Sequence, residues 1–215
     1  MFLSDYGEKK RVADILKQLE RSYPNANTAL HYKNEFELLV AVILSAQCTD
    51  KQVNKVTEKL FKKYRTPEDF AKLSPEELAV EIKGCGLYRS KAFYIVQTAR
   101  ELVNKHHSRV PDNRTELESL PGVGRKTANV VLSVAFGQAA MPVDTHVHRV
   151  AGRLGLASGK NPLETEKELI AKIPPPLRKD FHHRLITLGR EICTARKPHC
   201  SNCPLLSLCP GNKTT

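Results

Sequence analysis

The segment 120–126, LPGVGRK, has the most specific chemical pattern in the sequence. Helical patterns flank it, and Gly122 and Gly124 allow a tight backbone turn with accessible amides. A helix that begins directly after such a turn binds anions through its unpaired N–H groups and the positive end of its dipole. The pattern therefore predicts a helix-hairpin-helix that holds a DNA phosphate without reading the bases. An ordinary connection between two helices is the alternative.

A carboxylate follows one short helix further along, in the segment 143–150, VDTHVHRV. Asp144 and Thr145 are both typical N-cap residues, and taken alone Asp144 is best interpreted as a helix cap. The helix that begins near Lys126 ends at Gly137, however, and the chain then returns, which allows Lys126 and Asp144 to face one cleft. An amine and a carboxylate beside a phosphate-binding hairpin are the groups needed for nucleophilic attack on a sugar carbon.

Four cysteines, Cys193, Cys200, Cys203 and Cys209, lie close together near the end of the sequence. Four thiolates at this spacing can enclose a 4Fe-4S cluster or a tetrahedral zinc ion. Structural zinc sites usually combine two close pairs, and here only Cys200 and Cys203 form such a pair. The spacing predicts a metal site, and it leaves iron–sulfur and zinc both open.

The composition is that of a folded, soluble, nucleic-acid-binding or anion-binding protein. The 215 residues carry a net charge of +11, with a pI of about 9.4, which favours a polyanion or an anionic membrane surface as partner. Collagen-like, low-complexity and disordered classes are excluded. The longest apolar run, 38–44, is too short to cross a bilayer. With no readable secretory signal, we expect no membrane association and a reducing, cytoplasmic location.

Helical periodicity recurs along the chain without a clear strand pattern, so we predict an all-α fold. Ser74 as an N-cap, Pro75 at the first helical position and the two glutamates after it predict the start of one helix. We expect this helix to end at Gly84 or Gly86. The other predicted helices cover 7–23, 36–44, 53–61, 90–107, 115–120, 125–136, 145–154, 164–173 and 177–192.

The motifs LLVAVILSAQCTD, GLYRSKA, LPGVGRKTANVVLSVAFG and VDTHVHRV, followed by the four cysteines, resemble the bacterial endonuclease III family. Members of this family are DNA glycosylases with lyase activity that act on oxidised pyrimidines. The resemblance implies two helical domains on either side of a DNA-binding cleft, a 4Fe-4S cluster, and action as a monomer on double-stranded DNA with a damaged base or an abasic site. By similarity, a six-helix domain covers 28–138 with the helix-hairpin-helix at 115–136, and 1–27 and 139–215 form the cluster domain with the cluster loop at 193–209.

The resemblance also assigns catalytic roles. Lys126 matches the lysine that attacks C1′ of a flipped nucleotide, releases the base and forms a Schiff base, after which β-elimination cuts the strand. Because the attacking amine must be neutral, we expect partial burial and the positive helix end to favour the uncharged form. Asp144 matches the aspartate that stabilises the developing positive charge on the sugar.

Other positions match the family's DNA contacts and cluster ligands. Gln47 and Leu87 occupy the positions where side chains enter the duplex, although a leucine after a glycine would otherwise be an ordinary core contact. We interpret Cys48 and Cys85 as structural or incidental, and the pair 182–183, His-His, as a packing or DNA contact. The remaining expected DNA contacts are Gly122, Val123, Gly124, Arg125 and Thr145, and the expected cluster ligands are Cys193, Cys200, Cys203 and Cys209.

Two alternative functions stay open at this point. Monofunctional mismatch glycosylases of the same superfamily share the hairpin, the aspartate and the cluster, but they lack a lysine at the position of Lys126, and the adenine enzymes carry glutamate where this sequence has Gln47. A DNA-binding protein with no catalytic activity is the second alternative.

Overall fold

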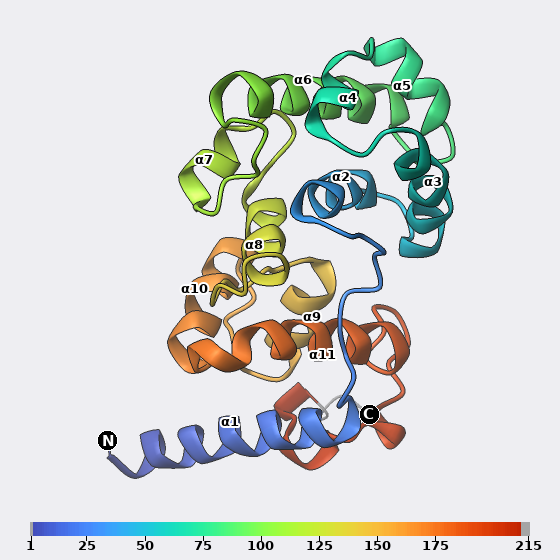
Figure 1. Cartoon of the computed structure of the whole chain (residues 1–215). Helices are drawn as coiled ribbons and strands as arrows, with labels where there is room; N and C mark the ends of the chain where they lie inside the picture. Colours follow the sequence, from blue (N-terminus) through green and yellow to red (C-terminus); the bar gives the residue numbers. More distant parts are fainter. Residues whose placement is uncertain (1, 212–215) are drawn as a thin grey trace. The chain divides into compact units, whose positions relative to one another are not determined.

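Every regular element in the computed structural model is a helix, which confirms the all-α prediction (Figure 1). The structure describes residues 2–211, with side chains from residue 7 onward. Contacts within this range divide the chain into two compact units. We call Ala29–Gln138 the hairpin unit, and the described residues up to Thr28 and from Ala139 onward the terminal unit.

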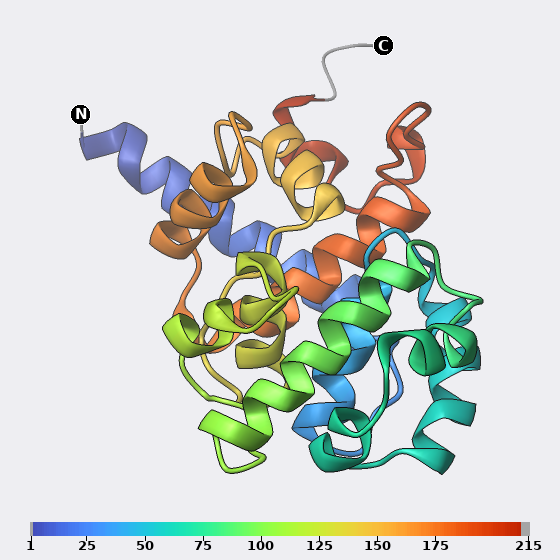
Figure 2. The same ribbon diagram turned by 90° about the horizontal axis from the view of Figure 1, so that it is seen from above.

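The hairpin unit is built around one apolar helix. Almost every side chain of α2 is buried, and α3, α6 and α8 all contact it. The short helices α4 and α5 pack on the long helix α6, as Figure 2 shows in teal and green. The helices of this unit are α2 (Glu35–Ser45), α3 (Asp50–Lys63), α4 (Pro67–Ala71), α5 (Pro75–Glu81), α6 (Tyr88–Lys105), α7 (Arg114–Ser119) and α8 (Arg125–Val134).

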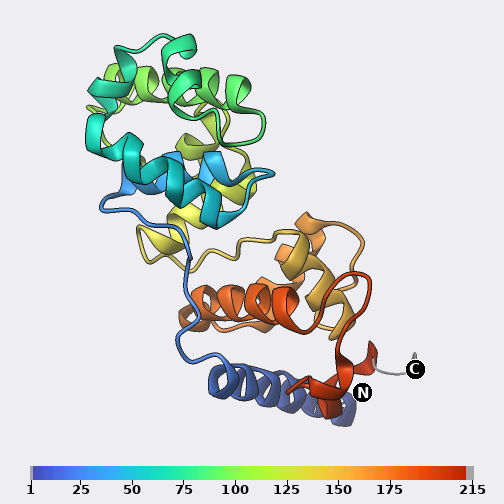
Figure 3. The same ribbon diagram turned by 90° about the vertical axis from the view of Figure 1, so that its right-hand side faces the viewer.

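The terminal unit joins the first helix of the chain to the last ones. In Figure 3, α1 lies alongside α11 and the red segment that follows it. Their shared core contains Ile15, Leu19, Val147, Phe181 and Leu185. The elements of this unit are α1 (Phe2–Ser22), α9 (Thr145–Arg153), α10 (Pro162–Lys172), α11 (Arg178–Glu191) and the 3₁₀ helices η1 (Pro175–Leu177), η2 (Cys200–Asn202) and η3 (Leu206–Leu208).

The structure differs from the predicted helices at α1, α4 and α5. Helix α1 begins at Phe2 rather than Gly7, and α4, only five residues long, was not predicted. Helix α5 begins as predicted, with a capping box at Ser74, but it ends at Glu81 rather than at a glycine. Gly84 serves packing instead, since a Cβ there would clash with Gln52.

No helix in the described part of the chain combines the length and the apolar character that crossing a membrane requires.

Candidate functional site

The turn between α7 and α8 is fixed by contacts with α6. Gly122 adopts a φ of +76°, in the left-handed region that favours glycine. A Cβ at this position would also lie 2.7 Å from Cβ of Tyr94. Thr98 donates a hydrogen bond of 2.6 Å to the carbonyl oxygen of Pro121, and Val123 is buried beneath the turn. The protein's own contacts therefore determine the shape of this turn.

The second glycine of the turn is not required by packing. Gly124 is the N-cap of α8 with a φ of −91°, and a Cβ there would meet no atom within 4 Å. No side chain caps α8, so the first turn of this ten-residue helix presents N–H groups and the positive end of its dipole. Arg125, whose guanidinium lies 4.0 Å from Glu118, adds positive charge beside it. This is an open, electropositive surface with room for an anion.

Lys126 is the second residue of α8, and its side chain is exposed. The expected partial burial is therefore wrong, because the first turn of α8 projects away from the core that Ala128 and Val131 enter. No carboxylate of the described hairpin unit forms an ion pair with Lys126, and its amine lies at the uncapped end of α8. Both features leave the amine available for chemistry.

Asp144 belongs to the other unit and caps α9. Its Oδ1 accepts a hydrogen bond of 2.8 Å from the amide of Val147, so the predicted capping role is confirmed. The side chain is half-buried, and the cap does not use Oδ2. Thr145, the first residue of α9, is exposed. The hairpin unit thus carries Lys126 and the terminal unit carries Asp144.

Gln47 and Leu87 lie on two turns of the hairpin unit that touch each other. A Cβ at Gly86, next to Leu87, would lie 3.2 Å from the carbonyl oxygen of Gln47. Both residues adopt left-handed conformations, with φ of +51° for Gln47 and +56° for Leu87, which side chains rarely adopt without a structural or functional constraint. Leu87 is 58% exposed, so it is not a core residue. The two turns present a polar and an apolar side chain side by side.

The four candidate cluster ligands line one cavity of about 330 Å³ at the end of α11. All four thiols are half-buried, and burial raises the pKa of Cys203, with a smaller contribution from the other three thiols. Within the described residues, no three potential ligands converge closely enough to bind a single metal ion. Thiols that surround a cavity fit a cluster, in which several iron atoms share the ligands, better than one tetrahedral zinc ion.

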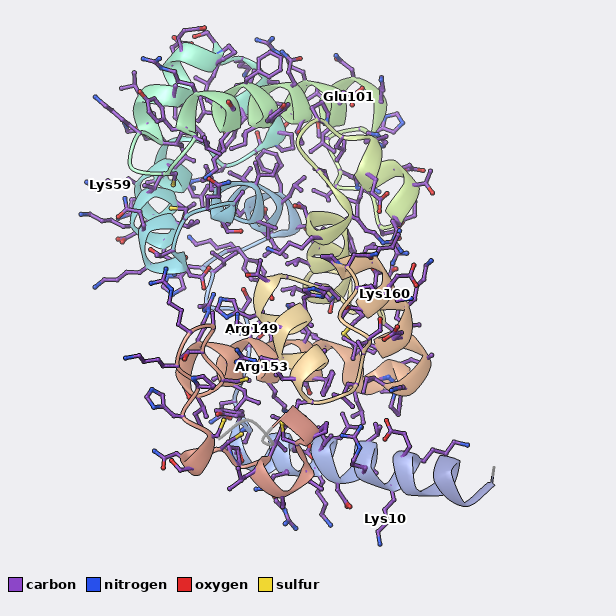
Figure 4. All side chains as sticks on the ribbon, turned by 180° about the vertical axis from the view of Figure 1, so that it is seen from behind. Lys10, Lys59, Glu101, Arg149, Arg153 and Lys160 are labelled. Carbon is purple, nitrogen blue, oxygen red and sulfur yellow. The ribbon has the colours of Figure 1, made fainter. Side chains whose placement is uncertain are left out.

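Two arginines of α9 tie the cluster loop to the helices, and sequence reasoning missed this role (both are labelled in Figure 4). Arg153 donates to the carbonyl oxygen of Thr194 at 2.7 Å and to Sγ of Cys193 at 3.4 Å. Arg149 donates to the carbonyl oxygens of Gly189 and Cys193 at 2.8 and 3.0 Å. The spacing of four residues, which places both on one helix face, was the only sequence signal.

Comparisons with known proteins agree with this geometry. Residues 40–175 match the family model described as HhH-GPD superfamily base excision DNA repair protein, and residues 193–209 match the iron-sulfur binding domain of endonuclease III. The second match identifies the cofactor as an iron–sulfur cluster rather than zinc, and the prediction of a 4Fe-4S cluster is confirmed.

Curated relatives cover nearly the whole chain. Endonuclease III of Bacillus subtilis is 50% identical over 201 residues, which are 93% of this chain and 92% of the relative. Endonuclease III of Escherichia coli K12 is 46% identical over 94% of this chain and 95% of its own length.

Solved structures of endonuclease III are also similar to this chain. A trapped covalent intermediate of endonuclease III with DNA superposes with a TM-score of 0.91 at 50% identity, covering 95% of this chain and 97% of that one. A thermostable thymine-DNA glycosylase has a TM-score of 0.87 but only 29% identity, covering 96% of this chain and 98% of that one. Sequence identity therefore separates this chain from that thymine-DNA glycosylase far more clearly than the fold does.

Proposed function

The chain belongs to the endonuclease III family of base-excision DNA repair proteins, and from this premise we propose that Lys126 is the nucleophile of a DNA glycosylase and lyase. The observation that carries the proposal is the exposed amine at the uncapped N-terminus of α8, directly after a turn shaped to approach an anion. The substrate is double-stranded DNA that contains an oxidised pyrimidine or an abasic site.

The proposed reaction gives each of these groups one step. The uncharged amine of Lys126 attacks C1′, and the electrons of the glycosidic bond leave with the base, which takes up a proton. Loss of the amine proton and opening of the sugar give a Schiff base. Removal of a proton from C2′ then expels the 3′ phosphate, and this β-elimination cuts the strand. Asp144, through Oδ2, stabilises the positive charge that develops on the sugar.

The remaining residues bind and position DNA. The amides of the turn at Gly122, Val123 and Gly124, together with Arg125, hold a phosphate. Gln47 and Leu87 fill the space that the flipped nucleotide leaves, the glutamine toward the orphan base and the leucine as an apolar wedge. Thr145, which follows Asp144 in the chain, contacts the DNA backbone.

The four cysteines Cys193, Cys200, Cys203 and Cys209 hold the 4Fe-4S cluster, which orders the loop between them when bound. The basic loop residues Arg196 and Lys197 then face the DNA backbone. The bacterial relatives support a cytoplasmic location, and we infer that the protein acts as a monomer.

Borohydride trapping on a thymine-glycol duplex tests the nucleophile, because reduction converts a Schiff base into a permanent protein–DNA adduct. Lys126→Gln is expected to reduce the adduct by at least about 100-fold. Lys59→Gln, which removes an exposed lysine from the outer side of α3 (Figure 4), is expected to leave it unchanged. An undiminished adduct in Lys126→Gln would refute the assignment.

The same assay separates the two roles of Asp144. Asparagine is as good an N-cap as aspartate but has no charge, so Asp144→Asn is expected to preserve α9 while slowing base release by about 100-fold. Base release at the wild-type rate would leave Asp144 with the capping role alone.

A further inference from the structure

The two cysteines outside the cluster meet in the hairpin unit, although they are far apart in sequence. Cys48 lies in the turn between α2 and α3, and Cys85 lies in the turn between α5 and α6. Their thiols are close enough to interact electrostatically, and both cysteines are reduced in this structure. The backbones beside them also touch, at the contact between Gly86 and the carbonyl oxygen of Gln47. The interpretation of Cys48 and Cys85 as structural or incidental therefore does not account for their proximity.

A buried ammonium accompanies the two thiols. Lys91 is only 4% exposed, and its Nζ donates a hydrogen bond of 2.8 Å to the carbonyl oxygen of Leu44. Burial lowers the pKa of Lys91, whereas its interaction with Cys48 and Cys85 raises it. Burial and Cys48 raise the pKa of Cys85 to about 11, and Lys91 opposes this shift. The thiolate is the form that reacts with a disulfide, so Lys91 lessens but does not cancel the cost that burial places on the reactive form of Cys85.

The two cysteines differ in accessibility. Cys48 is half-buried, next to the exposed Gln47, whereas Cys85 is 1% exposed. A reagent in solution can therefore reach Cys48 but not Cys85. This asymmetry gives the pair an order of reaction, with Cys48 attacking first and Cys85 second.

We propose that Cys48 and Cys85 form a reversible dithiol–disulfide site, in which oxidation by a small-molecule disulfide such as oxidised glutathione links the turn of Gln47 to the turn of Leu87. The thiolate of Cys48 attacks one sulfur of oxidised glutathione and releases one glutathione. The thiolate of Cys85 then attacks Sγ of Cys48 and expels the second glutathione. The two glutathiones take up the two thiol protons, and one disulfide is exchanged for another.

Oxidation changes the geometry of the two turns. Bonded sulfur atoms lie about 2 Å apart, closer than two thiols that are not bonded, so disulfide formation draws the two turns toward each other. Because even a Cβ at Gly86 would lie only 3.2 Å from the carbonyl oxygen of Gln47, there is little room between the turns, and this movement shifts Gln47 and Leu87. If these residues enter the duplex, which rests on the proposed function, the oxidised protein binds damaged DNA more weakly.

Peptide mapping of the cluster-loaded protein tests the disulfide directly. After incubation with oxidised glutathione, alkylation and trypsin digestion, we expect peptides 34–51 and 84–89, each with one cysteine, to appear as one cross-linked species that dithiothreitol separates. Cys48→Ala should give no cross-link, and Cys85→Ala should carry only glutathione on Cys48. Absorbance near 410 nm monitors the cluster throughout. Absence of the cross-link at a large excess of oxidised glutathione would overturn the proposal.

Binding to a duplex with a tetrahydrofuran abasic-site analogue tests the consequence. Oxidation is expected to raise Kd by about tenfold, dithiothreitol should restore it, and Cys48→Ala should not respond. A fully cross-linked protein with unchanged Kd would overturn the coupling to DNA binding. Reduced protein that fails to distinguish this duplex from undamaged DNA would count against the proposed function instead, and it would leave the disulfide result intact.

Discussion

The turn between α7 and α8 and the loop between α11 and Cys209 both lie next to a helix end, and both are proposed to meet a charged group. The hairpin turn is held from within, by the hydrogen bond of Thr98, the packing of Tyr94 on Gly122 and the buried side chain of Val123. The cluster loop contains only two three-residue 3₁₀ helices. Apart from the fully buried Leu205, its anchors are mainly hydrogen bonds from arginines.

This difference indicates how each region obtains its structure. The hairpin turn has its final form before any ligand binds, which preorganises its amides for a phosphate. Apart from Leu205 and Leu208, the residues of the cluster loop that pack on the core are its partly buried thiols, so metal binding supplies much of the folding free energy of the loop. The hairpin turn should therefore keep its structure without a bound phosphate, whereas the cluster loop should lose its structure without the metal.

Removal of the cluster is expected to have the largest effect on this comparison. Chelation of iron from the partly unfolded protein should leave the loop disordered, so that trypsin cleaves after Arg196 roughly 100 times faster than in the loaded protein. Cleavage after Arg125 or Lys126, at the start of α8, should not change. Mass spectrometry of the fragments over time measures both rates.

A cluster-free variant provides the control for chelator damage, and Cys203→Ser should give the same cleavage pattern as chelation. Equal protection of the loop with and without iron would contradict the contrast between the two regions, since the loop would then be held by its own contacts.

The two glycines of the hairpin turn provide the second test, because they differ in what they contact. Gly122→Ala places a Cβ in a left-handed conformation and against Tyr94, and it should lower the free energy of unfolding by about 3 kcal/mol. Gly124→Ala meets no atom of the protein, so it should change stability by less than about 0.5 kcal/mol. It should nevertheless weaken DNA binding, because the new methyl group occupies the space of the phosphate.

Urea unfolding and fluorescence anisotropy with duplex DNA measure the two effects separately. If a Gly124→Ala variant binds DNA as well as the wild type, no DNA phosphate binds at this turn. A stable Gly122→Ala variant would mean that the turn is less rigid than its contacts indicate.

The sequence predicted the features that depend on neighbouring residues. Helical periodicity and N-cap residues located most helices. The spacing of the two glycines indicated the hairpin turn, and the spacing of the four cysteines indicated the metal site. The end of α5 was wrong because Gly84 is present for packing against Gln52, a tertiary contact that a C-cap rule cannot include. The same limit hid the pairing of Cys48 with Cys85, which lie on different turns.

Electrostatic and exposure details were also beyond the sequence. Lys126 was expected to be partly buried, but its position in the first turn of α8 exposes it. Arg149 and Arg153 were visible as two arginines on one helix face, and only the folded chain reveals that their partners are carbonyl oxygens of the cluster loop. Each of these features depends on which distant segment a helix face meets.

A buried histidine in α11, the helix that leads into the cluster loop, provides the third and smallest test. His183 is 6% exposed, its ring packs against His182 at 4.9 Å, and burial, with a smaller contribution from Lys179, lowers its pKa from 6.5 to about 4. Between these two values the unfolded chain binds a proton that the folded chain does not, so stability must fall as the pH drops from 6.5 toward 4. The expected loss between pH 7 and pH 5 is about 2 kcal/mol.

Urea unfolding of the cluster-loaded protein at several pH values measures this slope. His183→Gln should reduce the pH dependence, whatever its effect on absolute stability, whereas His31→Gln, at an exposed position of the hairpin unit, should not. Because the cluster is present in all three proteins, acid lability of iron–thiolate bonds contributes equally to each slope. An unchanged slope in His183→Gln would assign the acid sensitivity of the terminal unit to the cluster alone, and would thereby strengthen the contrast between a region held by metal and one held by its own packing.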